Sequence, residues 1–223
     1  MARIIRELSF EEWVVHVFDH EGSGPEWYFD PDCDFWDGPA DNTIEYITRL
    51  FTDPMRYLQS YTDEQLGRGL WFLVSNGASD QMFALLDSAV LLETRLKCVR
   101  SFCDLFGKLF AKKCSSHLSH VDEPGANPIN VVCYMWWDLF PVAGSPDDAA
   151  GQALNRTILD VMEHSLNLDS IACQESALHG LGHWMRTYQE QVHEIIDSFL
   201  AGHPAVRPEL QNYARQARDC CIQ

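Results

Sequence analysis

Two histidines and a glutamate stand at helical spacing in the segment ESALHGLGH, which runs from Glu175 through His179 to His183. Residues four apart lie on the same side of a helix, so this spacing can present two imidazoles and one carboxylate to a single metal ion. A glycine follows His179 where the zincin motif HExxH has its glutamate, so metal-assisted hydrolysis lacks its general base. His164 or Glu163 of the preceding predicted helix can extend the set.

This histidine pair is expected to be a buried or interfacial pair rather than a metal site, and no cofactor is expected. The chain also contains no GxSxG, P-loop or GxGxxG motif, and its cysteines and histidines match no local signature of an activated thiol. A metal-dependent enzyme using Glu175, His179 and His183 therefore stands as an alternative to a non-catalytic function.

The stretch DPDCDFWDGPAD, which begins at Asp30, places carboxylates at the spacing of a calcium-binding loop. Asp30, Asp32, Asp34 and Asp41 fall at positions 1, 3, 5 and 12 of an EF-hand-like loop. Phe35 occupies the sixth position, which requires glycine, and position 12 carries an aspartate instead of the longer glutamate. Calcium binding is therefore not expected. The stretch is then interpreted either as a disordered acidic loop or as a recognition surface.

Aromatic side chains alternate with these carboxylates, which favours a recognition surface. Large rings bury apolar area against a partner, while surrounding carboxylates attract a cationic one. The same residues can instead fold back onto the basic helix predicted at residues 95–113. The expected partner-binding residues are Trp27, Asp30, Asp32, Asp34, Trp36 and Asp37.

The charge of the chain limits its partners. The formal net charge is −17, and residues 1–90 carry 17 acidic and 5 basic side chains. Such a chain repels nucleic acids and anionic membranes and attracts basic surfaces, so a basic protein is the expected partner. The one basic cluster comprises Arg95, Lys97, Arg100, Lys108, Lys112 and Lys113, and a solvated helix face is its expected role.

The cysteines indicate a reducing compartment. The chain has 8 cysteines but no CxxC pair, and its first residues lack the apolar core of a signal peptide. Cys98, Cys103, Cys133 and Cys173 lie in apolar helical patterns, where free cysteine behaves as a small hydrophobic residue. No apolar run reaches the roughly 20 residues that cross a bilayer. A soluble, cytoplasmic protein is expected.

The last four residues, which begin at Cys220, match the prenylation pattern C-a-a-X. The pattern is short, and the flanking charges are mixed rather than polybasic. An accidental match is expected.

Helical periodicity and helix caps dominate the chain. Capping boxes begin helices at Ser9 and Thr62, Ser79 caps another, and the Ser145-Pro-Asp and Pro208 positions are further starts. The sequence predicts roughly ten helices, no convincing strand, and one all-α domain over residues 1–223 with an acidic aromatic loop at 20–41 and a possible sub-boundary near 121–128. The longer predicted helices span about 92–117, 129–139, 147–166, 170–188 and 190–202.

Two helical segments share leucines, paired glycines and a closing tryptophan: Gln65–Trp71 and Ala177–Trp184. Glycine costs about 1 kcal/mol inside a helix, so a close neighbouring helix is expected to offset it. The wording Ala-Leu-x-Gly-Leu-Gly resembles the inner helices of HEAT-like repeats. The resemblance implies an irregular helical-repeat fold.

A small, reduced, strongly acidic helical chain is also similar in character to the immunity proteins that protect bacteria from their own toxins. That resemblance implies a non-catalytic inhibitor that covers a basic partner such as a toxin. A helical-repeat adaptor or scaffold, in which the acidic loop has no binding role, is the further alternative.

Overall fold

The computed structural model describes residues 3–141 and 149–222, and these residues form an almost entirely helical fold. The all-α prediction is therefore confirmed. Short 3₁₀ turns at Trp27–Phe29, Gln81–Leu86 and Ser119–Val121 connect some of the helices. The helices are α1 (Phe10–Phe18), α2 (Ala40–Thr52), α3 (Pro54–Leu58), α4 (Asp63–Val74), α5 (Leu92–Leu105), α6 (Ala111–Lys113), α7 (Ile129–Tyr134), α8 (Trp136–Leu139), α9 (Ala149–Leu166), α10 (Ile171–Trp184), α11 (Gln189–Gly202) and α12 (Pro208–Arg218).

Local capping signals define several of these helix starts. The Ser9 hydroxyl accepts a hydrogen bond from the Glu12 backbone N–H, and the Glu12 carboxylate accepts one from the Ser9 backbone N–H. The same reciprocal pair joins Thr62 and Gln65 at α4. Proline at the first position opens α12. These three predicted starts are confirmed.

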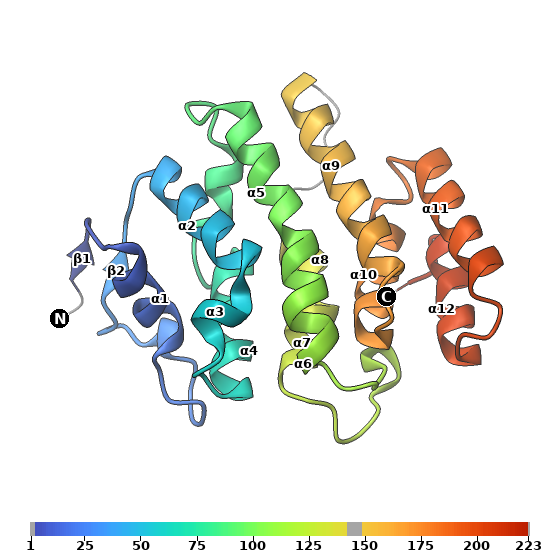
Figure 1. Cartoon of the computed structure of the whole chain (residues 1–223), viewed down its shortest axis with the longest axis horizontal. Helices are drawn as coiled ribbons and strands as arrows, with labels where there is room; N and C mark the ends of the chain where they lie inside the picture. The colour runs from blue at the N-terminus through green and yellow to red at the C-terminus, as the bar shows by residue number, and fades with distance from the viewer. Residues whose placement is uncertain (1–2, 142–148, 223) are drawn as a thin grey trace.

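The helices pack in two rows along the long axis of the molecule (Figure 1). In one row, α2 packs on α5 and α5 on α9; in the other, α4 packs on α7, α7 on α10, and α10 on α12. One connected cluster of buried apolar side chains extends from Phe10 to Ala217 and contains residues on both sides of the 121–128 loop. The two helices that share the leucine, glycine and tryptophan pattern, α4 and α10, both belong to the second row. A repeating unit stays a prediction.

Glycines on these two helices allow neighbouring elements to approach closely. A Cβ built at Gly69 lies 2.3 Å from the Phe18 ring, and one at Gly180 lies 2.6 Å from Cγ of Trp137. Each aromatic ring occupies the space that a methyl group requires. The expected close approach is confirmed, and it brings α8 against α10.

A short parallel pair of strands corrects the prediction that the chain has none. Strand β1 (Ile4–Ile5) pairs with β2 (Phe35–Trp36), so the acidic loop is tied to the N-terminal segment. The backbone N–H of Phe35 donates to the carbonyl of Arg3. Sequence periodicity does not reveal two-residue strands that are paired across thirty residues of chain.

Other predicted helix bounds also change. The segment predicted as one helix at 92–117 is interrupted by a π-helical turn at Phe106–Phe110, and the helix predicted from Ser79 is the 3₁₀ turn at 81–86. The predicted start at Ser145 lies outside the described residues. No helix in the described part of the chain is long and apolar enough to cross a membrane.

Candidate functional site

Trp36 does not lie on the surface. Its side chain is 3% exposed, and its ring stacks on Tyr46 with centroids 5.9 Å apart and planes at 13°. The prediction that Trp36 is a partner-binding anchor is therefore wrong. Alternation along β2 places its neighbour Phe35, 41% exposed, on the opposite side.

Trp27 is half-buried and packs on the core. Its ring stacks on His20 at 3.8 Å between centroids and lies 4.6 Å from the ring of Phe72. The most exposed ring of the loop belongs to Phe29, which is 64% exposed. Phe29 and Phe35, rather than the two tryptophans, are the exposed aromatic side chains of the loop.

The predicted aspartates are divided between internal contacts and solvent. Asp34 accepts hydrogen bonds from the Arg3 backbone and guanidinium, which lower the pKa of its carboxyl group. Asp37 lies 3.8 Å from the Arg6 guanidinium but is exposed. Asp30 accepts a hydrogen bond from the Asp32 backbone, and both of these residues are exposed. Asp30, Asp32 and Asp37 therefore face solvent as expected.

The basic cluster on α5 and the following turns contacts its own neighbours. Lys113 pairs with Asp63 at 2.9 Å, and Arg100 pairs with Glu93 at 2.8 Å. Asp34 and Asp37 of the acidic loop instead pair with Arg3 and Arg6. Within the described residues, the ion pairs of the loop are thus made with the N-terminal segment and not with these basic residues.

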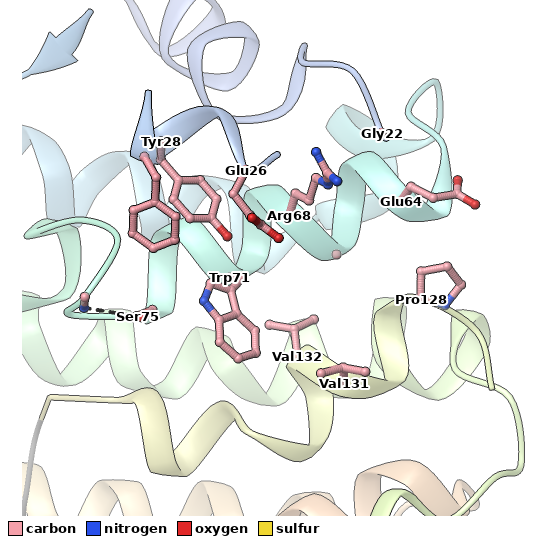
Figure 2. A pocket seen from close by; sticks show the side chains of 13 residues that line it. Gly22, Glu26, Tyr28, Glu64, Arg68, Trp71, Ser75, Pro128, Val131 and Val132 are labelled. Carbon is pink, nitrogen blue, oxygen red and sulfur yellow. Dashed lines mark hydrogen bonds between the residues drawn. The ribbon is translucent and has the colours of Figure 1, made fainter. Parts of the chain in front are cut away.

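A groove of about 660 Å³ lies between the acidic loop, α4 and α7 (Figure 2). Trp71 of α4 faces Val131 and Val132 of α7 across it, and Val131 is 54% exposed. The loop supplies the remaining apolar wall. The lining residues are Gly22, Glu26, Tyr28, Phe29, Glu64, Gly67, Arg68, Trp71, Ser75, Gly77, Pro128, Val131 and Val132.

Arg68 holds one side of this groove in place. Its guanidinium donates to the carbonyl oxygens of Glu21, Gly24 and Pro25 at 2.6 to 3.2 Å. Those contacts fix the guanidinium at the groove wall, where it keeps its positive charge, while the Glu26 and Glu64 carboxylates are exposed on the rim. The groove therefore has an apolar lining and exposed anionic groups.

The groove residues of α4 and α7 were missed by sequence reasoning. Trp71 and Val131 follow the same helical apolar pattern as core residues, but Val131 is exposed and Trp71 is only partly buried at the edge of the core. A β-branched apolar residue at an outward helix position is the signal that was available. Burial is required to distinguish it from the core.

A second site forms where α8 meets α10. His179 and His183 approach with their Nε2 atoms 3.2 Å apart, and Oδ1 of Asp138 lies 3.5 Å from Nε2 of His183. One possible ligand atom from each residue lies within 4.8 Å of the others, the only such group found among the described residues. The structure thus pairs the histidines with Asp138.

Glu175, the carboxylate predicted for this site, has other partners. It is fully buried, and its oxygens accept hydrogen bonds from the backbone N–H groups of Ser119 and His120 at 2.9 Å. Nδ1 of His120 lies 2.6 Å from the same carboxylate. Glu175 therefore ties the 3₁₀ turn at 119–121 to α10 and is not a member of the cluster. His164 and Glu163 are exposed on α9 and are also outside it.

His179 is the buried member of the cluster. Its Nδ1 lies 2.7 Å from the Tyr213 hydroxyl of α12. Burial, with a smaller effect from His183, lowers the pKa of His179 to about 4. The ring is therefore neutral at pH 7, which is the form that ligates metals.

Cys98, Cys133 and Cys173 are buried, as expected of small apolar side chains, and Cys103 is partly buried. All eight cysteines are free thiols. Near the C-terminus, the Ile222 side chain packs on α10 at Gly182.

Comparison with protein-family models, with curated proteins and with solved structures found no match.

Proposed function

We propose that the protein is a non-catalytic module that binds a basic segment of another protein in the groove between the acidic loop, α4 and α7. The observation that carries this proposal is an apolar groove with exposed carboxylates on its rim. Trp71 and Val131 can bury apolar area of a ligand, and Glu26 and Glu64 lie where they can pair with its cations. Apolar anchors within a charged rim are typical of protein recognition sites.

The charge around the groove favours a cationic occupant. The N-terminal 90 residues carry 17 acids against 5 bases, and in the groove lining the Glu26 and Glu64 carboxylates outnumber the Arg68 guanidinium. Lysine and arginine have long apolar stems that can lie along Trp71 while their charged ends reach the rim. A lysine- and arginine-rich segment with one apolar anchor therefore fits this site.

The finer proposal is an inhibitor that neutralises a basic partner, as immunity proteins do. Asp30, Asp32 and Asp37 are exposed beside Phe29 and Phe35, so the acidic loop extends the same anionic surface beyond the groove. Such a field accelerates encounter with a cationic partner and weakens with salt. An adaptor role does not require this excess of negative charge, so the charge favours an inhibitor.

Charge reversal on the groove rim tests the proposal. The wild-type chain and a Glu26→Lys/Glu64→Lys variant are used to capture partners from an extract of the native host. The matched control is Glu190→Lys/Glu194→Lys, because both residues are exposed on α11 and the change in net charge is the same. One dominant basic partner is expected with the wild type and the control, and not with the groove variant.

The captured partner is then purified, and its association rate is measured against salt. The groove variant should associate more slowly and with a flatter salt dependence than the control. Equal rates for the two variants, or an acidic partner, would contradict the proposal.

A further inference from the structure

The histidine cluster lies outside the groove and has no part in the proposed binding function. We propose that Asp138, His179 and His183 form a binding site for a divalent transition-metal ion of the Zn²⁺ type. This site belongs to the junction of α8 and α10. It replaces the Glu175-centred set that the sequence suggested with a set whose carboxylate comes from another helix.

The distances between the ligand atoms suit one ion. Zinc–nitrogen bonds of about 2.0–2.1 Å in tetrahedral geometry place neighbouring ligand atoms about 3.3–3.4 Å apart. The two Nε2 atoms are 3.2 Å apart, and Oδ1 of Asp138 is 3.5 Å from Nε2 of His183. Asp138 is exposed, so its side chain can rotate toward His179 at little cost.

The surroundings of His179 orient its ring for metal binding. When Nδ1–H donates to the Tyr213 oxygen, 2.7 Å away, the lone pair of Nε2 points toward His183. The Tyr213 hydroxyl can then donate to Tyr134, whose hydroxyl oxygen is 3.2 Å away. A hydrogen-bond acceptor behind a ligating histidine is the usual arrangement in protein metal sites.

Close packing of the two helices brings the carboxylate to the histidines. Gly180, between the two histidines, makes room for the Trp137 ring, and Asp138 follows Trp137 directly. A larger residue at Gly180 requires α8 to move away. The glycine that breaks the HExxH pattern thus positions the third ligand.

The donor set determines which ion is expected. Two imidazole nitrogens and one carboxylate oxygen favour zinc and neighbouring transition metals over Mg²⁺ and Ca²⁺, which prefer oxygen ligands. Three protein ligands leave a fourth tetrahedral position for solvent or a small ligand, as in zinc sites that are open to reaction. The exposure of Asp138 and His183 places that position at the surface.

Metal titration of the full chain tests the proposal. After treatment with EDTA and dialysis, the protein is titrated calorimetrically with Zn²⁺ and by visible absorption with Co²⁺, with Mg²⁺ as the comparison ion. One Zn²⁺ per chain and a tetrahedral Co²⁺ spectrum are expected, with no competing effect of Mg²⁺. Removal of one ligand in His183→Ala should weaken Zn²⁺ binding by about 100-fold or more, since loss of a ligand exceeds loss of its outer-shell support.

Two further variants separate this site from the alternatives. Asp138→Asn should weaken Zn²⁺ binding by about 10- to 100-fold and alter the Co²⁺ spectrum, whereas a bare histidine pair on α10 would be unaffected. His164→Ala, an exposed histidine on α9, is the matched control and should bind as the wild type does. Circular dichroism checks that each variant is folded. No stoichiometric Zn²⁺ binding by the wild type, or binding that is unchanged in Asp138→Asn, would overturn the proposal.

The metal titration and the capture experiment do not depend on each other. Glu26 and Glu64 lie in the groove lining, whereas the metal ligands lie on α8 and α10. Failure of one proposal therefore leaves the other standing.

Discussion

Phe35 and Trp36 are neighbours in the chain, but the protein uses them differently. Both are aromatic and both are flanked by aspartates, so composition alone makes them equivalent as anchors. Pairing of β2 with β1 decides between them, because successive residues of a strand point to opposite sides. Trp36 joins the core, and Phe35 faces solvent. A recognition role can be assigned to a residue only once the pairing partner is known.

At the residue scale, the groove makes a specific prediction for Val131. Val131→Ser removes exposed apolar surface from the groove and should weaken partner binding by about 1 kcal/mol or more, which is the usual cost of losing an interface anchor. Val15 on α1, 50% exposed against 54% for Val131, provides the matched control Val15→Ser. Both variants should change folding stability by no more than about 0.5 kcal/mol. Binding to the captured partner is measured by surface plasmon resonance, and equal affinities for the two variants would contradict the assignment.

The contacts of Glu123 predict that folding stability depends on pH in the acidic range. The Arg207 guanidinium and the Leu118 backbone N–H lower the pKa of Glu123 to about 2. Because this folded-state pKa is below the unfolded value, the unfolded chain binds more protons in acid. The stabilisation is present above about pH 4.5 and is lost as the pH falls toward 2.

Glu123→Gln removes this contribution, so stability should fall less steeply between pH 5 and pH 3 in the variant than in the wild type. Urea unfolding at several pH values measures the difference. Glu209→Gln is the control, because Glu209 contacts Arg207 at 3.4 Å but is exposed. If the stability of Glu123→Gln falls as steeply with decreasing pH as that of the wild type, this contact does not determine the pH dependence of stability.

At the element scale, helix starts were predictable because their signals are local. A capping box joins residues three apart, so Ser9 and Thr62 identified α1 and α4 directly. The π-helical turn at Phe106–Phe110 was not predictable from the sequence, because its apolar pattern continues that of α5. That turn alters the rotation of the helix after residue 105, an effect that depends on packing rather than on sequence periodicity.

Gly180 provides an element-scale test of helix packing. Alanine is favoured over glycine by about 1 kcal/mol inside a helix, so Gly180→Ala would stabilise an isolated α10. In the protein, its Cβ would lie 2.6 Å from Cγ of Trp137, so α8 and α10 must separate. A net loss of about 1–3 kcal/mol in the free energy of unfolding is expected, because overpacking outweighs propensity.

The matched control is Gly202→Ala, since a Cβ built at Gly202 at the end of α11 has no neighbour within 4 Å. That variant should be neutral or slightly stabilised. Chemical denaturation of both variants measures the two changes. A stabilised Gly180→Ala would mean that α8 adapts without cost and that the glycine does not set the distance between the helices.

At the scale of the whole molecule, the sequence identified ingredients of the sites better than their combinations. The histidine pair was predictable because both residues lie on one helix, but Asp138 comes from a different helix. Asp138 lies beside the histidines because Trp137 packs against Gly180, a contact across more than forty residues of chain. The groove likewise combines three separate segments. Sites that combine side chains from separate segments can therefore be recognised only from the fold.

The net charge of −17 predicts how the thermal stability of the whole fold responds to salt. Excess charge of one sign destabilises a compact chain by self-repulsion, and salt screens charges that are farther apart than about 8–10 Å. Close pairs such as Arg3–Asp34, at 2.6 Å, are affected less than the long-range repulsion. The thermal midpoint should therefore rise by a few degrees when NaCl increases from roughly 10 mM to roughly 150 mM.

KCl should act equally, because the effect depends on ionic strength. Glu190→Gln/Glu194→Gln should show a smaller rise, since two exposed charges are removed. A midpoint that falls with salt would mean that attractive pairs outweigh the repulsion, and the anionic surface would then be balanced within the fold instead of directed at a partner.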